Sequence, residues 1–208
     1  GFNKVDYAVG CTYKYLNGGP GSPAFIYVRD KELVKLKSPI RGWFSHEKPF
    51  EYSNEYNESN SIEKFSNGTP HILSLSTLRT SLDITIEATT EEINIKSVKL
   101  FDYFISIYED ELKKLNFELL SPMDKNNRGS HIAISHEEAW RISKCLIDPI
   151  DDDEQSIIID FRPNNIIRIA LTPLYTTYKD IYLICKRLIN IINEEEFKKK
   201  DNSMEGVT

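Results

Sequence analysis

Residues 11–28 read CTYKYLNGGPGSPAFIYV, and Lys14 lies there between a run of small and apolar residues and a turn rich in glycine and proline. The three glycines of residues 18–21 let the backbone turn sharply and approach a ligand closely, and the nearby prolines stiffen the turn. A lysine normally titrates near about 10.4, but burial or a neighbouring positive charge lowers its pKa enough for the amine to attack a carbonyl. We interpret Lys14 as a reactive amine presented in a dry pocket, and the alternative is a solvated loop charge.

The composition is that of an ordinary globular protein. The chain has 208 residues, with 26 basic against 32 acidic residues and a net charge of -6. That length can bury a core for one domain or one and a half. The basic residues form no stripe that could bind a phosphate backbone, and no apolar run is long enough to span a membrane. We expect a soluble, cytoplasmic protein that binds neither nucleic acid nor membrane, and a start at Gly1 without methionine suggests the second half of a longer protein.

The cysteines and histidines indicate neither disulfides nor a metal site. The three cysteines are odd in number and far apart, so we expect small buried thiols. The four histidines lack a metal-binding spacing such as His-x-x-x-His, and we expect no bound metal. These residues are Cys11, Cys145 and Cys185, and His46, His71, His131 and His136.

The first third of the sequence predicts a pair of strands and a long irregular segment. Residues 5–9 and 24–28 are short strands that would lie side by side, and residues 29–38 indicate a surface helix or loop. Residues 39–68 show no sustained period of 2 or 3.6. An irregular segment of this length is uncommon unless it has a function.

Two successive helices are predicted next. From residue 69 onward, leucine and isoleucine at positions 75, 78, 82 and 86 predict one buried helical face. Thr89 and Glu92 form a capping box that starts a second helix, and its apolar residues recur at spacings of three and four from Val98 to Leu115. This second helix would have about seven turns and would link two domains.

The remainder of the chain predicts a compact α+β domain. Runs of β-branched residues predict a small antiparallel sheet, with hairpin chemistry at residues 163–165. Ser135 and Glu138 form a second capping box, and a charged, then small and polar tail is expected to fray. The predicted strands are 117–120, 131–134, 157–161 and 166–171, and the two predicted helices end near residues 147 and 196.

Arg168 interrupts the apolar run of residues 166–171, where a charge is costly unless it is paired. A guanidinium fork suits a bidentate grip on the α-carboxylate of an amino acid. The alternative is a strand arginine that faces solvent. After Lys14, Arg168 is the strongest candidate for a functional side chain.

Read as one string, residues 6–25, DYAVGCTYKYLNGGPGSPAF, resemble the cofactor-lysine segment of the kynureninases. These are pyridoxal-phosphate (PLP) enzymes of the aspartate-aminotransferase superfamily. The resemblance continues through the chain in the order of that family. The further motifs are GWFSH at 42–46, NGTP at 67–70, RGSH at 128–131, NIIR at 165–168 and TPLY at 172–175.

The resemblance implies an α/β fold of the PLP-dependent transferase-like class, fold type I. The chain would hold the end of the large domain and the α+β C-terminal small domain. In enzymes of this family, other residues face the pyridine nitrogen, stack on the cofactor and bind most of its phosphate. The corresponding residues would precede Gly1. The implied divisions are residues 1–74 for the large domain with the active-site loop, 75–116 for long interdomain helices, 117–197 for the small domain and 198–208 for a flexible tail.

The resemblance also implies roles for single residues. Lys14 would hold PLP covalently and then act as base and acid, with Tyr13 near the phosphate as a proton relay. Trp43 would donate its indole N–H to the phosphate, although a lone loop tryptophan is as often a hydrophobic anchor. Thr69 would reach the phosphate from the neighbouring subunit, and a helix cap is its alternative or additional role.

Arg168 would grip the substrate's α-carboxylate, and Gly68 would lie against the substrate. The implied reaction is hydrolysis of L-kynurenine or 3-hydroxykynurenine to an anthranilate and L-alanine, in tryptophan degradation and NAD precursor synthesis. A homodimer would share the site across its interface. Two alternatives stay open: a non-catalytic piece that dimerises or complements a separate first half, and another lysine-dependent PLP reaction such as transamination or desulfuration.

Overall fold

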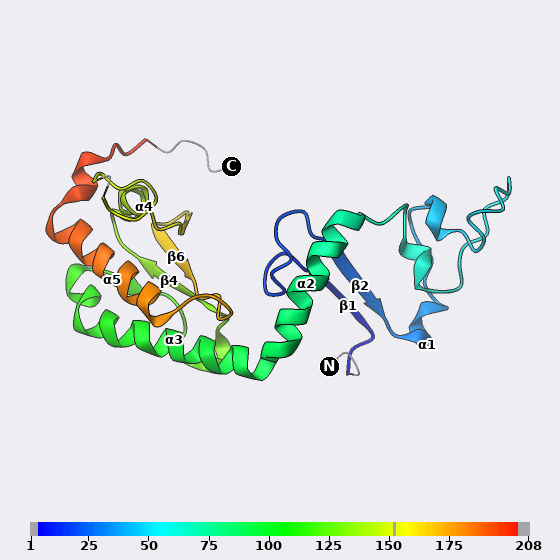
Figure 1. The fold of residues 1–208 in the computed structure, drawn as a ribbon, viewed down its shortest axis with the longest axis horizontal. Coiled ribbons are helices and arrows are strands. Elements are labelled where there is room, and N and C mark those ends of the chain that lie inside the picture. Colours follow the sequence, from blue (N-terminus) through cyan, green and yellow to red (C-terminus); the bar gives the residue numbers. More distant parts are fainter. Residues whose placement is uncertain (1–3, 152, 204–208) are drawn as a thin grey trace. The chain divides into compact units, whose positions relative to one another are not determined.

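The computed structural model describes residues 4–151 and 153–203 and divides the chain into two compact units, Gly1–Glu87 and Ala88–Thr208 (Figure 1). The first unit is built on a two-stranded hairpin, and the second on a four-stranded sheet. Among the described residues, no helix combines the length and the apolar character that crossing a membrane requires.

The first unit opens with an antiparallel hairpin of β1 (Tyr7–Cys11) and β2 (Ala24–Val28). The pairing runs from Tyr7 opposite Val28 to Cys11 opposite Ala24. The predicted bounds of β2 are confirmed, whereas β1 begins and ends two residues later than predicted. Pairing with β2 sets the register, and this carries β1 up to the turn that holds Lys14.

The rest of the first unit is mostly irregular. A short helix, α1 (Asp30–Leu33), follows β2. The predicted irregular segment, residues 39–68, contains two 3-10 turns, η2 (Trp43–Ser45) and η3 (Ile62–Phe65), and is otherwise loop. The unit ends in the long helix α2 (Ile72–Ala88).

The prediction that α2 buries one apolar face is wrong for this chain. Leu78 is 7% exposed, but Leu75 is 39% and Ile86 is 73% exposed. The predicted helix is present. The period of its apolar residues identifies the apolar face of the helix, but it does not show that another element packs against that face. Among the described residues of the first unit, Val28 is the other buried apolar side chain, so the unit offers α2 little core to pack on.

The second unit holds an antiparallel sheet with strand order β3-β4-β6-β5. The predicted hairpin between β5 and β6 is confirmed, and Asn164 and Asn165 at its turn have φ of 67° and 59°. Asparagine tolerates this left-handed region better than most residues. The strands are β3 (Glu118–Leu119), β4 (His131–Ser135), β5 (Asp160–Arg162) and β6 (Ile166–Ala170).

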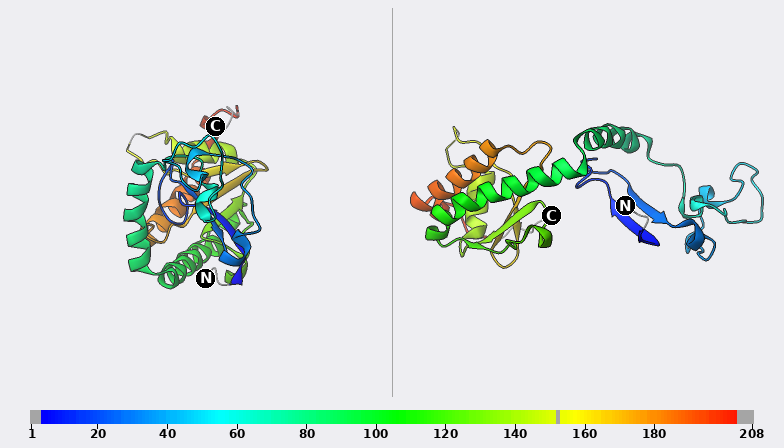
Figure 2. Two further views of the ribbon diagram at one scale, coloured as in Figure 1. Left: turned by 90° about the vertical axis from the view of Figure 1, so that its right-hand side faces the viewer. Right: turned by 90° about the horizontal axis from the view of Figure 1, so that it is seen from below.

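Three helices cover one face of this sheet, and α3 and α5 run beside each other there (Figures 1 and 2). Ile132 and Ile134 of β4 lie opposite Ile169 and Ile167 of β6, and all four join one apolar cluster with the helices. The helices are α3 (Thr90–Asp110), α4 (Ala139–Ile147) and α5 (Tyr178–Asn193), with 3-10 turns at Leu112–Leu115, Lys125–Asn127 and Glu196–Lys199.

One of the two predicted capping boxes is confirmed in part. The Thr89 hydroxyl accepts the Glu92 N–H at 3.3 Å, at the start of α3. The box at Ser135 and Glu138 is wrong, because the ladder with β6 continues through Ser135 and keeps it extended. At α4 the ring Nδ1 of His136 accepts the Glu138 N–H instead, at 3.0 Å.

The segment predicted to be a flexible tail makes contacts with α4 as far as the structure describes it. The indole N–H of Trp140 donates to the Ser203 carbonyl at 3.0 Å. The Lys144 ammonium is 2.7 Å from the Asp201 carboxylate. Residues 204–208 lie outside the described residues.

Candidate cofactor and substrate site

A network of hydrogen bonds shapes the turn that carries Lys14. The Lys14 carbonyl accepts the Asn17 N–H at 2.9 Å, and the Thr12 carbonyl accepts the Gly18 N–H at 3.0 Å. The buried Thr12 hydroxyl donates to the Pro23 carbonyl at 2.5 Å and so ties the two ends of the turn together. Lys14 is therefore held on a closed, well-bonded loop at the end of the hairpin.

The glycines act in this turn as the sequence predicted. Gly19 and Gly21 have φ of 78° and 82°, a region that side chains strain to adopt. A Cβ at Gly18 would lie 2.5 Å from the Ser22 hydroxyl oxygen and 3.0 Å from the Thr12 carbonyl. The turn depends on both the conformational freedom and the small size of glycine.

Lys14 is presented rather than enclosed. Its side chain is exposed, and its Nζ lies 5.3 Å from the centre of the Tyr13 ring, which is itself half exposed. The expected dry pocket around Lys14 is therefore wrong for the described residues. The hairpin supplies one wall, and a pocket would need further walls from outside the hairpin.

Trp43 packs among aromatic rings in the irregular segment. Its ring centre lies 4.6 Å from that of Phe44 and 5.5 Å from that of Phe50. The indole N–H donates to the Pro49 carbonyl at 2.8 Å. The side chain is 46% exposed, so Trp43 is a hydrophobic anchor that still has an accessible face.

The fully buried Ser45 organises the loop around Trp43. Its hydroxyl oxygen accepts the Gly42 N–H at 2.9 Å and lies 2.8 Å from the Tyr56 hydroxyl. Its carbonyl accepts the Ser59 N–H at 2.9 Å. Sequence reasoning missed this serine, whose only signal is its place inside the GWFSH motif.

Close backbone packing at Gly42 joins two of the motifs. A Cβ at this position would lie 2.2 Å from the Asn67 carbonyl oxygen and 2.3 Å from the Asn67 Cα. The segment with Trp43 therefore lies against the segment with Gly68 and Thr69. The structure brings these predicted residues together, and Gly68 and Thr69 are both exposed.

Replacing Gly42 with alanine should destabilise this junction by about 1–3 kcal/mol, because the obstructing atoms belong to backbone and cannot rotate away. Faster hydrogen exchange or proteolysis across residues 42–70 would measure the loss. Gly68→Ala is the matched control, since a Cβ at Gly68 has no neighbour within 4 Å. Equal protection in both variants would contradict the prediction.

Arg168 lies on the face of the sheet opposite to the apolar cluster. Its neighbours Ile167 and Ile169 point into that cluster, and strand alternation turns Arg168 the other way. The guanidinium forms an ion pair with Asp160, the residue directly opposite on β5. The charge in the apolar run is paired, as its cost requires, and the side chain is 40% exposed; the grip on an α-carboxylate stays a prediction.

Asp160 serves two arginines at once. Its Oδ2 is 3.0 Å from Nε of Arg162, on the same strand, and also contacts Nη2 of Arg168. Two guanidinium groups share one carboxylate, so the cluster carries one excess positive charge. The sequence did not point to Asp160 by any motif, although counting back from the hairpin turn would have placed it opposite Arg168.

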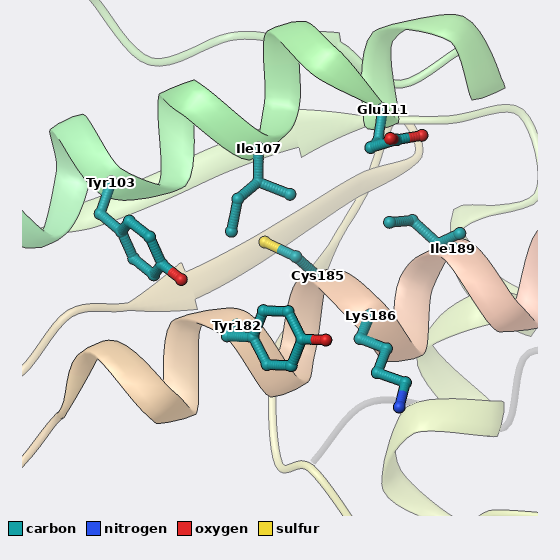
Figure 3. A pocket seen from close by; sticks show the side chains of 7 residues that line it. All are labelled: Tyr103, Ile107, Glu111, Tyr182, Cys185, Lys186 and Ile189. Carbon is teal, nitrogen blue, oxygen red and sulfur yellow. The ribbon is translucent and has the colours of Figure 1, made fainter.

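Two hollows of the second unit contain none of the predicted site residues. One is a groove of about 460 Å³ between α3 and α5 (Figure 3), where burial raises the pKa of the Cys185 thiol to about 12. The other is lined largely by acidic side chains. No group of three metal-ligating side chains occurs among the described residues. The groove is lined by Tyr103, Ile107, Glu111, Tyr182, Cys185, Lys186 and Ile189.

The comparisons with known proteins find similarity to kynureninases. Residues 93–188 match the family model of the kynureninase C-terminal domain. Over 205 residues the chain is 40% identical to a kynureninase of Geobacillus thermodenitrificans and 39% identical to one of Shouchella clausii. Each comparison covers 98% of this chain and 46% of the relative. The chain thus spans about half the length of the curated relatives it matches.

Solved structures of similar fold are enzymes of PLP fold type I. A cysteine desulfurase from Thermococcus onnurineus matches with a TM-score of 0.72 at 15% identity, covering 91% of this chain and 48% of its own. The cystine C-S lyase C-DES matches with a TM-score of 0.68 at 17% identity, covering 90% and 47%. At such identities the likeness establishes the fold alone, and it confirms the predicted fold class.

Proposed function

We propose, from the relationship of this chain to the C-terminal part of the kynureninases, that it belongs to a PLP-dependent hydrolase that cleaves L-kynurenine or 3-hydroxykynurenine. One observation carries the proposal. An accessible lysine stands on a closed glycine turn in a chain that is 40% identical to a kynureninase over 205 residues. The same fold in cysteine desulfurases does not choose between reactions.

The described residues fit the cofactor. PLP, when bound, supplies an aldehyde for covalent attachment and a conjugated ring that withdraws electrons from the substrate. The exposed amine of Lys14 is free to reach such an aldehyde, and the exposed Thr69 offers a hydroxyl to a phosphate. Trp43 would join them once its N–H leaves the Pro49 carbonyl.

In this proposal the side chains position the substrate and move its protons. Lys14 takes the proton from the substrate's Cα, and Tyr13, beside it, relays protons. Arg168 binds the α-carboxylate, and Gly68 leaves room for the substrate because it has no side chain. Water adds to the γ-carbonyl and the Cβ–Cγ bond breaks. Anthranilate leaves, Cβ takes up one proton, and Lys14 returns the proton that it removed from Cα, which gives L-alanine.

The assembly in this proposal is a cytoplasmic homodimer in which Thr69 of one subunit serves the site of the other. Two features support it. Cys11, Cys145 and Cys185 are free thiols, as expected in a reducing compartment. The first unit leaves apolar side chains such as Val9 and Leu73 uncovered, and an assembly would bury them.

Covalent trapping tests the proposal directly. The protein is incubated with PLP, reduced with borohydride and digested, and we expect the cofactor's mass on the peptide that contains Lys14. Parallel samples receive L-kynurenine, 3-hydroxykynurenine or L-cysteine, and we expect anthranilates from the first two. Label on other lysines only, or sulfide from cysteine without anthranilate, would reject the proposal.

A second candidate is a non-catalytic piece that complements a separate first half. The poorly covered first unit favours it, because Val9, Leu73 and Ile86 are each more than two-thirds exposed. In that case the chain alone would not be labelled at Lys14. Labelling would appear after a separately produced first half of a related kynureninase is added.

A further inference from the structure

Asp160 occupies a fixed position between two cations. It pairs with Arg168 across the β5–β6 ladder, so its backbone is anchored by the sheet. Asp160 and Arg162 are two residues apart on one strand, which places both on the face that carries Arg168. A three-residue turn, residues 163–165, with left-handed Asn164 and Asn165 fixes the register that creates this arrangement.

We propose that Asp160 is a positioning residue that aims the Arg168 guanidinium at the α-carboxylate of the substrate. This inference rests on the proposed function. Among the described residues, Asp160 is the ion-pair partner of Arg168, with a contact to Nη2 of the guanidinium. A guanidinium has five N–H donors in one plane, so a group that binds one carboxylate can also bind a second.

The charges of the cluster favour this role over simple neutralisation. One carboxylate between Arg162 and Arg168 leaves one positive charge, which an amino acid's α-carboxylate would balance. Without Asp160 the two guanidinium groups face each other with like charge and repel. Arg168, which is partly exposed, would then turn toward solvent, and its guanidinium would no longer be oriented toward the substrate carboxylate.

Removing Asp160 would have two opposing effects on substrate binding, so the direction of the change in affinity shows which effect is larger. Removing a negative charge increases attraction for any anion, so electrostatics alone predicts tighter substrate binding. Losing the orientation of the fork predicts weaker binding, because a bidentate contact requires the correct plane. We expect the loss of orientation to outweigh the electrostatic gain. Water and salt screen the attraction between exposed charges, but they do not reduce the need for a correctly oriented guanidinium.

The first experiment needs no activity. Arginines of the intact chain are labelled with phenylglyoxal and mapped by mass spectrometry in wild type, Asp160→Asn and the control Glu109→Gln. Glu109 is an exposed acid of the same unit, paired with Lys113. Asp160→Asn should accelerate labelling of Arg168 severalfold. Arg141, an arginine of α4 that pairs with Glu138, should keep its rate in all three proteins. An unchanged rate at Arg168 would overturn the inference even if the protein cleaves kynurenine.

The second experiment uses the assembled, PLP-loaded enzyme. Asp160→Asn should raise KM for kynurenine about tenfold with kcat within about twofold, equivalent to the loss of one charge-assisted contact. On kynurenine α-carboxamide, wild type and variant should have equal KM, and Asp160→Glu should restore part of the loss on kynurenine.

An equal rise of KM on the carboxamide would show that Asp160 has a structural role, and a lower KM on kynurenine would show that Asp160 competes with substrate. A wild type without cleavage would reject the proposed function alone, and the labelling experiment would still decide on Asp160.

Discussion

Replacing Lys14 with arginine is expected to abolish covalent attachment of PLP and to lower kynurenine turnover by about a thousandfold. The guanidinium keeps the positive charge, but it stays protonated and cannot bond to an aldehyde or exchange protons at Cα. The exposed turn tolerates the larger side chain, so the fold should be retained. Absorbance of the bound cofactor, the trapped peptide mass and anthranilate release measure the three effects.

The control for this variant is Lys48→Arg. Lys48 is another exposed lysine of the first unit, where it pairs with Glu51 at 3.1 Å, and arginine should preserve that pair. Unchanged trapping and turnover are expected. If Lys14→Arg bound the cofactor covalently as well as the wild type does, the assignment of this lysine would be refuted.

Replacing Arg187 with methionine is expected to cost the second unit about 3–5 kcal/mol of unfolding free energy. Arg187 is 6% exposed and makes a bidentate pair with the buried Glu196, at 2.6 and 2.7 Å, and it also contacts Glu154. Removing the cation leaves a buried carboxylate without its partner. Urea unfolding followed by far-UV circular dichroism would measure the loss.

The pH dependence of stability gives an independent test of this pair. The hydrogen bond from Arg187 lowers the pKa of Glu196 from its ordinary value of 4.5. A depressed folded pKa contributes stability that is present above 4.5 and is lost as the pH falls through the folded value. This contribution to acid sensitivity should vanish in Arg187→Met.

Two further variants complete the comparison. Arg187→Met combined with Glu196→Leu should recover much of the lost stability, because a buried apolar pair avoids the uncompensated charge. Lys113→Met removes an exposed cation of the same unit and should leave unfolding unchanged. An Arg187→Met protein as stable as Lys113→Met would contradict the prediction.

Local sequence patterns predicted elements whose cause is local. The bounds of β2, the asparagine hairpin between β5 and β6, and the Thr89 cap all depend on a few neighbouring residues. The buried face of α2 and the dry pocket around Lys14 failed for a different reason. Burial requires a partner surface, and the described residues of the first unit do not provide one.

For the candidate site, the motifs identified segments but not their contacts. Sequence placed Trp43 and Thr69 in separate motifs, and the backbone packing of Gly42 on Asn67 brings these motifs together. It singled out Arg168 as a charge in an apolar run, but the partner Asp160 emerged from strand register. Pairings across a hairpin or between loops depend on three-dimensional geometry that a one-dimensional motif does not contain.

The apolar cluster under the sheet lies wholly within Ala88–Thr208, the part of the chain that carries Arg168. Lys14 stands on the other unit, whose turn is maintained by hydrogen bonds and glycines. Among the described residues, the hydrogen bonds of the lysine turn involve none of the isoleucines and leucines of that cluster. In the function proposed here, mutations in the cluster would therefore change the contact of Arg168 with the substrate and leave the attachment of the cofactor to Lys14 unchanged.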